Sequence, residues 1–293
     1  MKNLDTEHLL PRGASPLPSC PGDIRVHHWT SKSLHRRRPV LVYLPPGYTT
    51  EDPWRYPVLY VHDGQNIFDP KTSAFGVDWG LGQVIEKELI AQTIVPLIVV
   101  AIYNTRYRME EYTPTVDYRE RGGKAKEFLE AVVNELKPFI DSQYHTRTDP
   151  ASTGIMGSSL GGLLALYASQ SFAHVFQKVA ALSPSLWWSG RDLVSSMAGA
   201  NEFYRPNRLW LDMGTRESNE DRNRNGVPDV LDDLRMLRYV LLGRGMQEGL
   251  DLHVEEISGA SHTESDWGRR VDRVLRFLYP KQNDASLGIP QSG

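Results

Sequence analysis

The chain of 293 residues has one cysteine, Cys20, and so cannot form an internal disulfide. Its fold therefore does not depend on oxidation. No run of residues approaches the roughly 18 apolar positions that a membrane-spanning helix requires, and the first residues lack the apolar stretch of a secretory signal. We expect no membrane partner and a cytoplasmic location, although a secreted chain trimmed of its signal would have the same sequence.

The sequence also lacks an excess of charge of one sign. Its 33 Lys and Arg residues nearly balance 36 Asp and Glu residues, which gives a formal net charge of −3. Proteins that bind nucleic acid through its phosphates usually present a strongly basic surface, so we expect no nucleic-acid partner. The content of 40% hydrophobic and 24% charged residues is typical of a globular protein and indicates no particular oligomeric state.

Proline and glycine divide the chain into three parts. Residues 1–22 are polar and rich in Pro and Gly, which predicts a flexible N-terminal arm. Residues 23–280 contain the periodic apolar segments and have the length of a single α/β domain. The polar tail at 281–293 is expected to be disordered.

Apolar strands alternate with amphipathic helices throughout residues 23–280. Two early strands precede a short apolar third one, and the later strands are continuously apolar. This pattern predicts an α/β fold with a largely parallel central sheet and helices on both faces. Strands are expected at 23–29, 39–44, 57–62, 95–103, 178–182, 209–213 and 250–257, with another ending at Met156, and helices at 81–89, 125–139, 230–241 and 267–278 and from Leu160 onward.

The motif G-x-S-x-G occurs at Gly157 to Gly161, between the strand that ends at Met156 and a helix that begins at Leu160. A strand, a glycine turn and a helix in this order form the nucleophile elbow of an α/β-hydrolase fold, which exposes the central serine. Ser159 would then lie at the positive end of a helix, where an oxyanion is stabilised. The alternative is a glycine-rich turn that merely starts a helix.

A serine nucleophile needs a base, and His262 is the best placed of the nine histidines. It lies in a loop of small residues directly after the strand at 250–257 and before the last helix. Loops at the carboxyl ends of parallel strands surround the site of an open α/β sheet, so His262 is within reach of Ser159. The alternative is a loop histidine that caps the last helix.

The acid that orients the base is expected after the strand at 209–213, which lies between the elbow and the histidine loop in the chain. Glu217 is nearest to the end of that strand and is the preferred residue, with Glu220 and Asp221 as alternatives. The oxyanion hole needs two backbone N–H groups, for which the sequence offers Leu160 after the nucleophile and Gln65 in the loop after the third strand.

Taken together, these motifs resemble the esterase D-like group of α/β hydrolases, which includes enterochelin esterases, feruloyl and acetylxylan esterases, S-formylglutathione hydrolase and mycolyltransferases. The resemblance is nearest to the enterochelin esterase-like branch. It implies a triad of Ser159, His262 and a carboxylate at Glu217, oxyanion donors at Gln65 and Leu160, and no catalytic cofactor. The similar stretches are 42–48, 59–69, 108–114, the elbow, 181–188, 212–217 and 259–262.

The segment 221–233 departs from the pattern of that family. Oxygen-bearing residues stand at alternate positions around Gly226, as in loops that bind Ca²⁺. We therefore predict a structural Ca²⁺ site, with a polar loop that caps the helix at 230–241 as the alternative. The predicted ligands are Asp221, Asn223, Asn225, the carbonyl of Val227, Asp229 and Asp232.

Aromatic residues gather in segments that are expected to surround the site, where their rings would form apolar walls for a substrate. The sequence therefore predicts a serine carboxylesterase that acts on small-molecule esters, with short or aromatic acyl groups preferred over long chains. An acyltransferase with the same triad and a non-catalytic binding domain of the same fold are the rival interpretations. The predicted pocket residues are Asp63, Trp79, Tyr112, Trp187 and Trp188.

Overall fold

The computed structural model describes residues 22–51 and 53–281. The predictions for the arm at 1–22, with Cys20, and for the tail at 281–293 fall outside the described residues, except at Gly22 and Lys281. Within the described ranges, no helix has the length and hydropathy that crossing a membrane requires.

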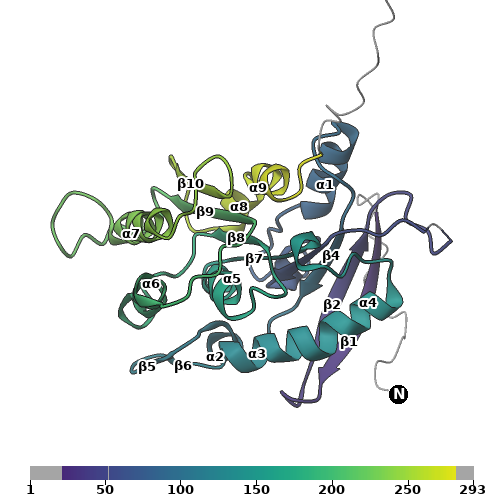
Figure 1. Ribbon diagram of the computed structural model, residues 1–293, viewed down its shortest axis with the longest axis horizontal. Helices are drawn as coiled ribbons and strands as arrows, with labels where there is room; N and C mark the ends of the chain where they lie inside the picture. Colours follow the sequence, from purple (N-terminus) through teal and green to yellow (C-terminus); the bar gives the residue numbers. More distant parts are fainter. Residues whose placement is uncertain (1–21, 52, 282–293) are drawn as a thin grey trace, which may run out of the picture.

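An eight-stranded sheet forms the centre of the molecule, in the order β1-β2-β4-β3-β7-β8-β9-β10 (Figure 1). The pairs β1–β2 and β2–β4 are antiparallel, and the five remaining pairs are parallel. The predicted α/β-hydrolase fold with a largely parallel sheet is confirmed. The strands are β1 (Asp23–Ser31), β2 (Arg36–Leu44), β3 (Val58–His62), β4 (Ile98–Ile102), β7 (Thr153–Ser158), β8 (Lys178–Leu182), β9 (Arg208–Gly214) and β10 (Leu252–Ile257), and β5 (Val116–Asp117) and β6 (Arg121–Gly122) form a separate hairpin.

Helices cover both faces of the sheet and enclose two hydrophobic cores. Helices α2 to α7 pack on one face, and α1, α8 and α9 pack on the other (Figure 1). Strands β3 and β4 contribute buried side chains to both cores, and both are apolar except at His62, the last residue of β3. The helices are α1 (Leu81–Ile90), α2 (Arg108–Tyr112), α3 (Ala125–Ala131), α4 (Lys137–Gln143), α5 (Leu160–Ser171), α6 (Trp188–Gly199), α7 (Asp229–Gly243), α8 (Glu264–Gly268) and α9 (Val271–Leu278), with a π-helical stretch η2 (Val132–Leu136) between α3 and α4.

Helix α5 lies deep in the core, and nine of its 12 residues are buried. A helix with no polar face is stable in water only when other elements surround it. Its N-terminus is therefore rigidly placed at the carboxyl edge of the sheet. The loops that follow β3, β9 and β10 leave the sheet at the same edge, which brings segments far apart in the chain to one place.

Candidate active site

Ser159 lies at the junction between β7 and α5, as the G-x-S-x-G spacing predicts. Its backbone has φ 57° and ψ −123°, a conformation that is strained for any residue with a side chain. The turn requires glycine at its flanks, because a Cβ atom on Gly157 would lie 2.5 Å from the carbonyl carbon of Gly161. The Ser159 amide donates to the carbonyl of Leu182 at 3.0 Å, so β8 fixes the turn from its side.

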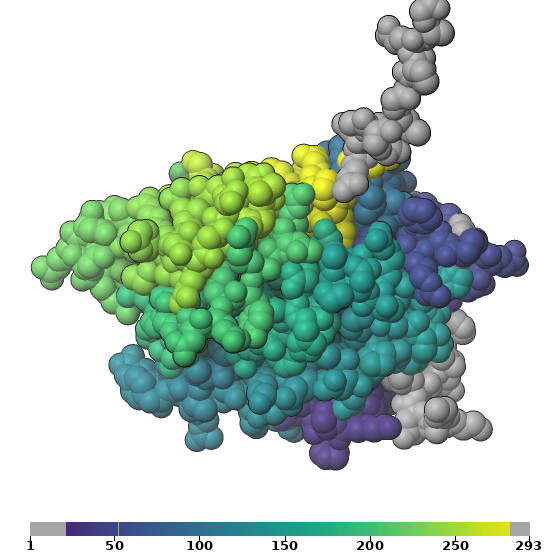
Figure 2. Space-filling view, in the orientation of Figure 1, coloured from purple at the N-terminus to yellow at the C-terminus, as the bar shows by residue number. Residues whose placement is uncertain are grey.

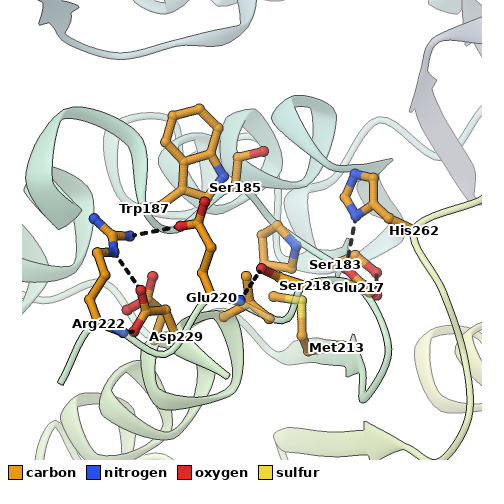
Figure 3. A pocket seen from close by; sticks show the side chains of 13 residues that line it. Ser183, Ser185, Trp187, Met213, Glu217, Ser218, Glu220, Arg222, Asp229 and His262 are labelled. Carbon is orange, nitrogen blue, oxygen red and sulfur yellow. Dashed lines mark hydrogen bonds and ion pairs between the residues drawn. The ribbon is translucent and has the colours of Figure 1, made fainter. Parts of the chain in front are cut away.

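His262 and Glu217 are in contact although 45 positions separate them in the chain. His262 Nδ1 and Glu217 Oε2 are 2.8 Å apart (Figure 3). The Glu217 side chain is 2% exposed and that of His262 is 41% exposed, so the carboxylate is enclosed and the imidazole is open to ligands. Ser159 and His262 line the same cavity, which brings the predicted nucleophile and base to a common space.

The two alternative acids point elsewhere. The Asp221 carboxylate accepts the amides of Asn225 and Gly226 at 3.0 and 2.9 Å within its own loop. The Glu220 side chain is 72% exposed and lies 3.8 Å from the guanidinium of Arg222. Of the three carboxylates that the sequence offers, Glu217 is the one bonded to His262.

The second oxygen of Glu217 is held by groups that the sequence did not reveal. Glu217 Oε1 accepts from Ser183 Oγ at 2.5 Å and from the Gly214 amide at 2.6 Å, and Arg270 Nη2 lies 3.9 Å away. Asp212 of β9 is fully buried and pairs with Arg270 at 2.7 Å. The one feature of the sequence that could have indicated a role for Ser183 is its position directly after β8, at the carboxyl edge of the sheet.

The predicted oxyanion donors both lie in first turns of helices. Leu160 is the first residue of α5, and Gln65 lies in the 3-10 turn η1 (Gly64–Asn66) that follows β3. Amides in a first turn have no acceptor within their own helix, so they are suited to bind an anionic oxygen.

Asp63 fixes the start of the η1 turn. Its backbone is left-handed with φ 56°, and its amide donates to Tyr112 Oη at 3.2 Å. Its carboxylate accepts two bonds of 2.8 Å from Arg108, and one of 2.6 Å from Asn104 Nδ2. Sequence reasoning assigned no role to Arg108 or Asn104, although Arg108 begins the family-like stretch 108–114.

Two cavities meet at His262. The larger has a volume of about 530 Å³ and extends from His262 toward Trp187 and the loop before α7 (Figure 3). Its wall combines the Trp187 ring with charged groups at Glu220 and Arg222. The smaller has a volume of about 310 Å³, and its walls include Ser159, Gln65, Asp63, Arg108, Phe75 and Glu264.

Of the four aromatic residues predicted to surround the site, one lines a cavity, and the prediction is wrong for the other three, which are buried. Trp187 is 45% exposed and lines the larger cavity, and Asp63 lines the smaller one. Trp79, Tyr112 and Trp188 are 3%, 0% and 1% exposed and line neither cavity. They are held inside by other partners: Trp79 packs on Trp267, Tyr112 lies beneath Asp63, and Trp188 Nε1 donates to the carbonyl of Thr115.

The predicted Ca²⁺ loop projects from the body of the molecule, in green at the left of Figures 1 and 2. Four of its six predicted ligands lie together, since Asn223 and Asn225 donate to Asp232 at 2.9 and 2.8 Å and Asn225 also donates to Asp221. Asp229 instead pairs with Arg222. Among the described residues, no group of three or more His, Cys, Asp or Glu side chains is placed to hold a metal ion. The Ca²⁺ site stays a prediction.

Two buried titratable groups lie on the segments that carry the predicted site: His62 ends β3, and Glu264 begins α8 and lines the smaller cavity. His62 is 1% exposed, and burial lowers its pKa from 6.5 to about 4. Its ring contacts Tyr112 and Phe128, and within the described part of the chain neither ring nitrogen has a hydrogen-bond partner. Glu264, two residues beyond His262, has a pKa raised by burial.

Comparison with known proteins places this chain among esterases. The family described as "Putative esterase" matches residues 31–278. Ferri-bacillibactin esterase BesA of Bacillus subtilis is 28% identical over 87% of this chain and 90% of its own length. The protein named "Uncharacterized protein YbbA" of the same organism is 26% identical over 86% of this chain and 97% of its own length.

The fold is also that of a solved esterase. The enterobactin esterase FES from Shigella flexneri superposes with a TM-score of 0.69 over 90% of this chain and 61% of that protein. The two sequences are 21% identical, so the likeness concerns the fold.

Proposed function

The chain belongs to this esterase family and is a carboxylesterase, and we propose that it works through an acyl-enzyme on Ser159. The observation that carries the proposal is the 2.8 Å contact between His262 Nδ1 and Glu217 Oε2, beside a serine held in the strained conformation of an elbow. A carboxylate in this position fixes the imidazole in the tautomer that leaves Nε2 free to accept a proton.

The reaction follows the two half-reactions of a serine hydrolase. Ser159 Oγ attacks the ester carbonyl and gives its proton to His262 Nε2, while the Gln65 and Leu160 amides stabilise the negative oxygen. The tetrahedral intermediate collapses, the bond to the alcohol oxygen breaks, and the alcohol leaves with the proton from His262. Water then attacks the acyl-enzyme with the same base, and Ser159 recovers its proton as the acid is released.

The cavities favour small polar or aromatic esters over lipid esters. Trp187 offers a flat, half-exposed ring for an aromatic or sugar-like group. Charged side chains at Glu220, Arg222 and Asp233 share the wall of the larger cavity. A long alkyl chain would have to remove water from these charges without replacing it, which is unfavourable. Because BesA is named as a ferri-bacillibactin esterase, a siderophore ester belongs among the substrates to be tested.

The test is hydrolysis of p-nitrophenyl acetate by the purified full chain, together with labelling by a fluorophosphonate. We expect Ser159→Ala to lose both hydrolysis and labelling, and His262→Ala to lose hydrolysis by a factor on the order of 10⁴ or more. Ser169→Ala is the matched control, because Ser169 is a fully buried serine of α5 whose hydroxyl bonds within its own helix, donating to the carbonyl of Leu166 and accepting from Gln170 Nε2. Activity above a few per cent in Ser159→Ala would contradict the mechanism.

Two rival functions predict different results in the same assays. An acyltransferase with this triad would pass the acyl group to an added alcohol faster than to water. A non-catalytic binding domain would neither hydrolyse the ester nor react with the fluorophosphonate. The enclosed carboxylate behind His262 speaks against the second rival, because a binding domain has no need of an oriented base.

A further inference from the structure

Ser183 follows β8 and is 1% exposed. Its backbone is left-handed with φ 45°, an unfavourable conformation for serine. Its amide donates to the carbonyl and to Oδ1 of Asp212 at 3.0 and 3.1 Å, which holds it in this position. The strain is thus maintained by specific bonds at a site that no step of the reaction above uses.

The Ser183 hydroxyl meets three side chains. Trp267 Nε1 lies 2.8 Å from Ser183 Oγ, and Arg270 Nη2 lies 2.7 Å from it. An indole N–H and a guanidinium N–H can only donate, and a hydroxyl oxygen accepts at most two such bonds. The single Ser183 proton therefore has one acceptor left, which is Glu217 Oε1 at 2.5 Å.

This arrangement fixes the orientation of the Glu217 carboxylate. Oε1 is occupied by the Ser183 hydroxyl and the Gly214 amide, so Oε2 is left to face His262 Nδ1. Every group that contacts the carboxylate is a donor, which is what an ionised carboxylate requires. The Arg270 cation near Oε1 is itself balanced by Asp212 at 2.7 Å.

Arg270 is buried at some energetic expense. It is 1% exposed, and in the described residues its Nε and Nη1 atoms have no hydrogen-bond partner. Buried donors without a partner destabilise a folded protein, so a buried arginine with two such donors is expected to have a specific role. Its Nη2 bonds to Ser183 and Asp212 supply one, because they place the hydroxyl that holds Glu217.

We propose that Ser183 is a positioning residue of the triad, which orients Glu217 toward His262 and is itself oriented by Trp267 and Arg270. The inference rests on the proposed function. Its role is exerted through Glu217, since the Ser183 hydroxyl accepts hydrogen bonds from Trp267 and Arg270 and donates one to the Glu217 carboxylate. Loss of the hydroxyl should release Oε1 and let the carboxylate rotate away from His262 Nδ1.

The test compares Ser183→Ala with Ser183→Cys, which keeps the size of the side chain and a weak S–H donor. We expect kcat for p-nitrophenyl acetate to fall by about 10- to 100-fold in Ser183→Ala, with KM changed little, and less in Ser183→Cys. Ser169→Ala should behave as the wild type. Rates are normalised to the fraction of chains that a fluorophosphonate labels to completion, which removes any effect of misfolded protein.

Proton NMR supplies a second measurement that does not depend on turnover. The Nδ1 proton of His262, held against a carboxylate, should resonate far downfield of the backbone amides in the wild type and broaden or disappear in Ser183→Ala. Wild-type kcat together with an unchanged signal in Ser183→Ala would overturn the inference. If Ser183→Ala does not fold, the same comparison with Ser183→Cys decides. A wild type that neither hydrolyses esters nor reacts with the fluorophosphonate would contradict the proposed function, while the NMR signal would still test the positioning.

Discussion

Asn66 Nδ2 donates a hydrogen bond of 3.2 Å to Glu264 Oε1 and so joins two loops that are 198 positions apart in the chain. Asn66 ends the turn that carries Gln65, and Glu264 lies two residues beyond His262. Asn66 Oδ1 also accepts the Ala74 amide at 3.1 Å. The proposed oxyanion turn and the loop of the proposed base are therefore held together by side chains that take no part in the chemistry.

We predict that Asn66→Ala and Glu264→Ala each lower kcat by about tenfold, because either change releases one loop from the other. The double variant should be no worse than the single ones, since both remove the same bond. Glu264→Gln is the control and should keep most of the activity, because its amide oxygen can still accept from Asn66. Losses that multiply in the double variant would show that the two residues act independently.

His62 should make the protein less stable in acid. Its pKa is lowered to about 4, chiefly by burial, with Arg108 and Arg38 adding to the effect and Asp63 opposing it. As pH falls through 6.5 the unfolded chain takes up a proton that the folded chain accepts only near pH 4. Neutral His62 therefore contributes fully to the free energy of unfolding above pH 6.5. Between pH 6.5 and pH 4 this contribution, about 3 kcal/mol, is lost.

The measurement is urea unfolding of the wild type and His62→Leu at pH 7 and pH 4. We expect the free energy of unfolding to fall less between these pH values in His62→Leu, whatever its stability at pH 7, because the titrating group is gone. Equal losses in both proteins would mean that other groups govern the acid sensitivity.

The assignment of the acid can be tested with two neighbouring carboxylates. Glu217→Gln should lower kcat by about 10²-fold or more, because the amide of glutamine can donate to Nδ1 and thereby favour the wrong tautomer of His262. Asp221→Asn is the matched control and should leave kcat unchanged, since Asp221 bonds to backbone amides of its own loop. A larger loss in Asp221→Asn, measured without added Ca²⁺, would reverse the assignment.

The elements around the site could be predicted because each leaves a local pattern. The elbow is a five-residue motif between an apolar run and a helical repeat, and the loops of Glu217 and His262 follow apolar strands. Ser183 and Arg270 leave no such pattern, since 87 positions separate them and only the folded sheet brings them together.

Trp187 and Trp188 show that the burial of a single ring cannot be predicted from the sequence either. They are adjacent and identical in type, yet one is 45% exposed and the other 1%, because packing at the start of α6, and not a period in the sequence, decides which ring is buried.

Ca²⁺ should raise the melting temperature if the loop at 221–232 binds it, because an ion that binds the folded state alone stabilises that state. Asn225 is hydrogen-bonded to Asp221 and Asp232, and Asn223 is bonded to Asp232, whereas Asp229 would have to leave Arg222. The measurement compares melting in excess Ca²⁺ and in EDTA, with Asp232→Asn as a variant that should lose the shift. No difference in the wild type would favour the alternative, a polar loop that starts α7.

The value of kcat/KM should depend on the length of the acyl group and be higher for the proposed substrates than for lipid esters. The larger cavity places the Trp187 ring beside charged side chains, so an aromatic or short acyl group finds one apolar wall while a long chain must also cover the charges. We predict a higher kcat/KM for p-nitrophenyl acetate or butyrate than for the palmitate ester, each presented in soluble form. Trp187→Ala should lower kcat/KM for an aromatic acyl ester more than for the acetate, because only the aromatic group stacks on the ring. A preference for palmitate would refute this account of the pocket and leave the triad standing, since the contact between His262 and Glu217 does not involve the cavity wall at Trp187.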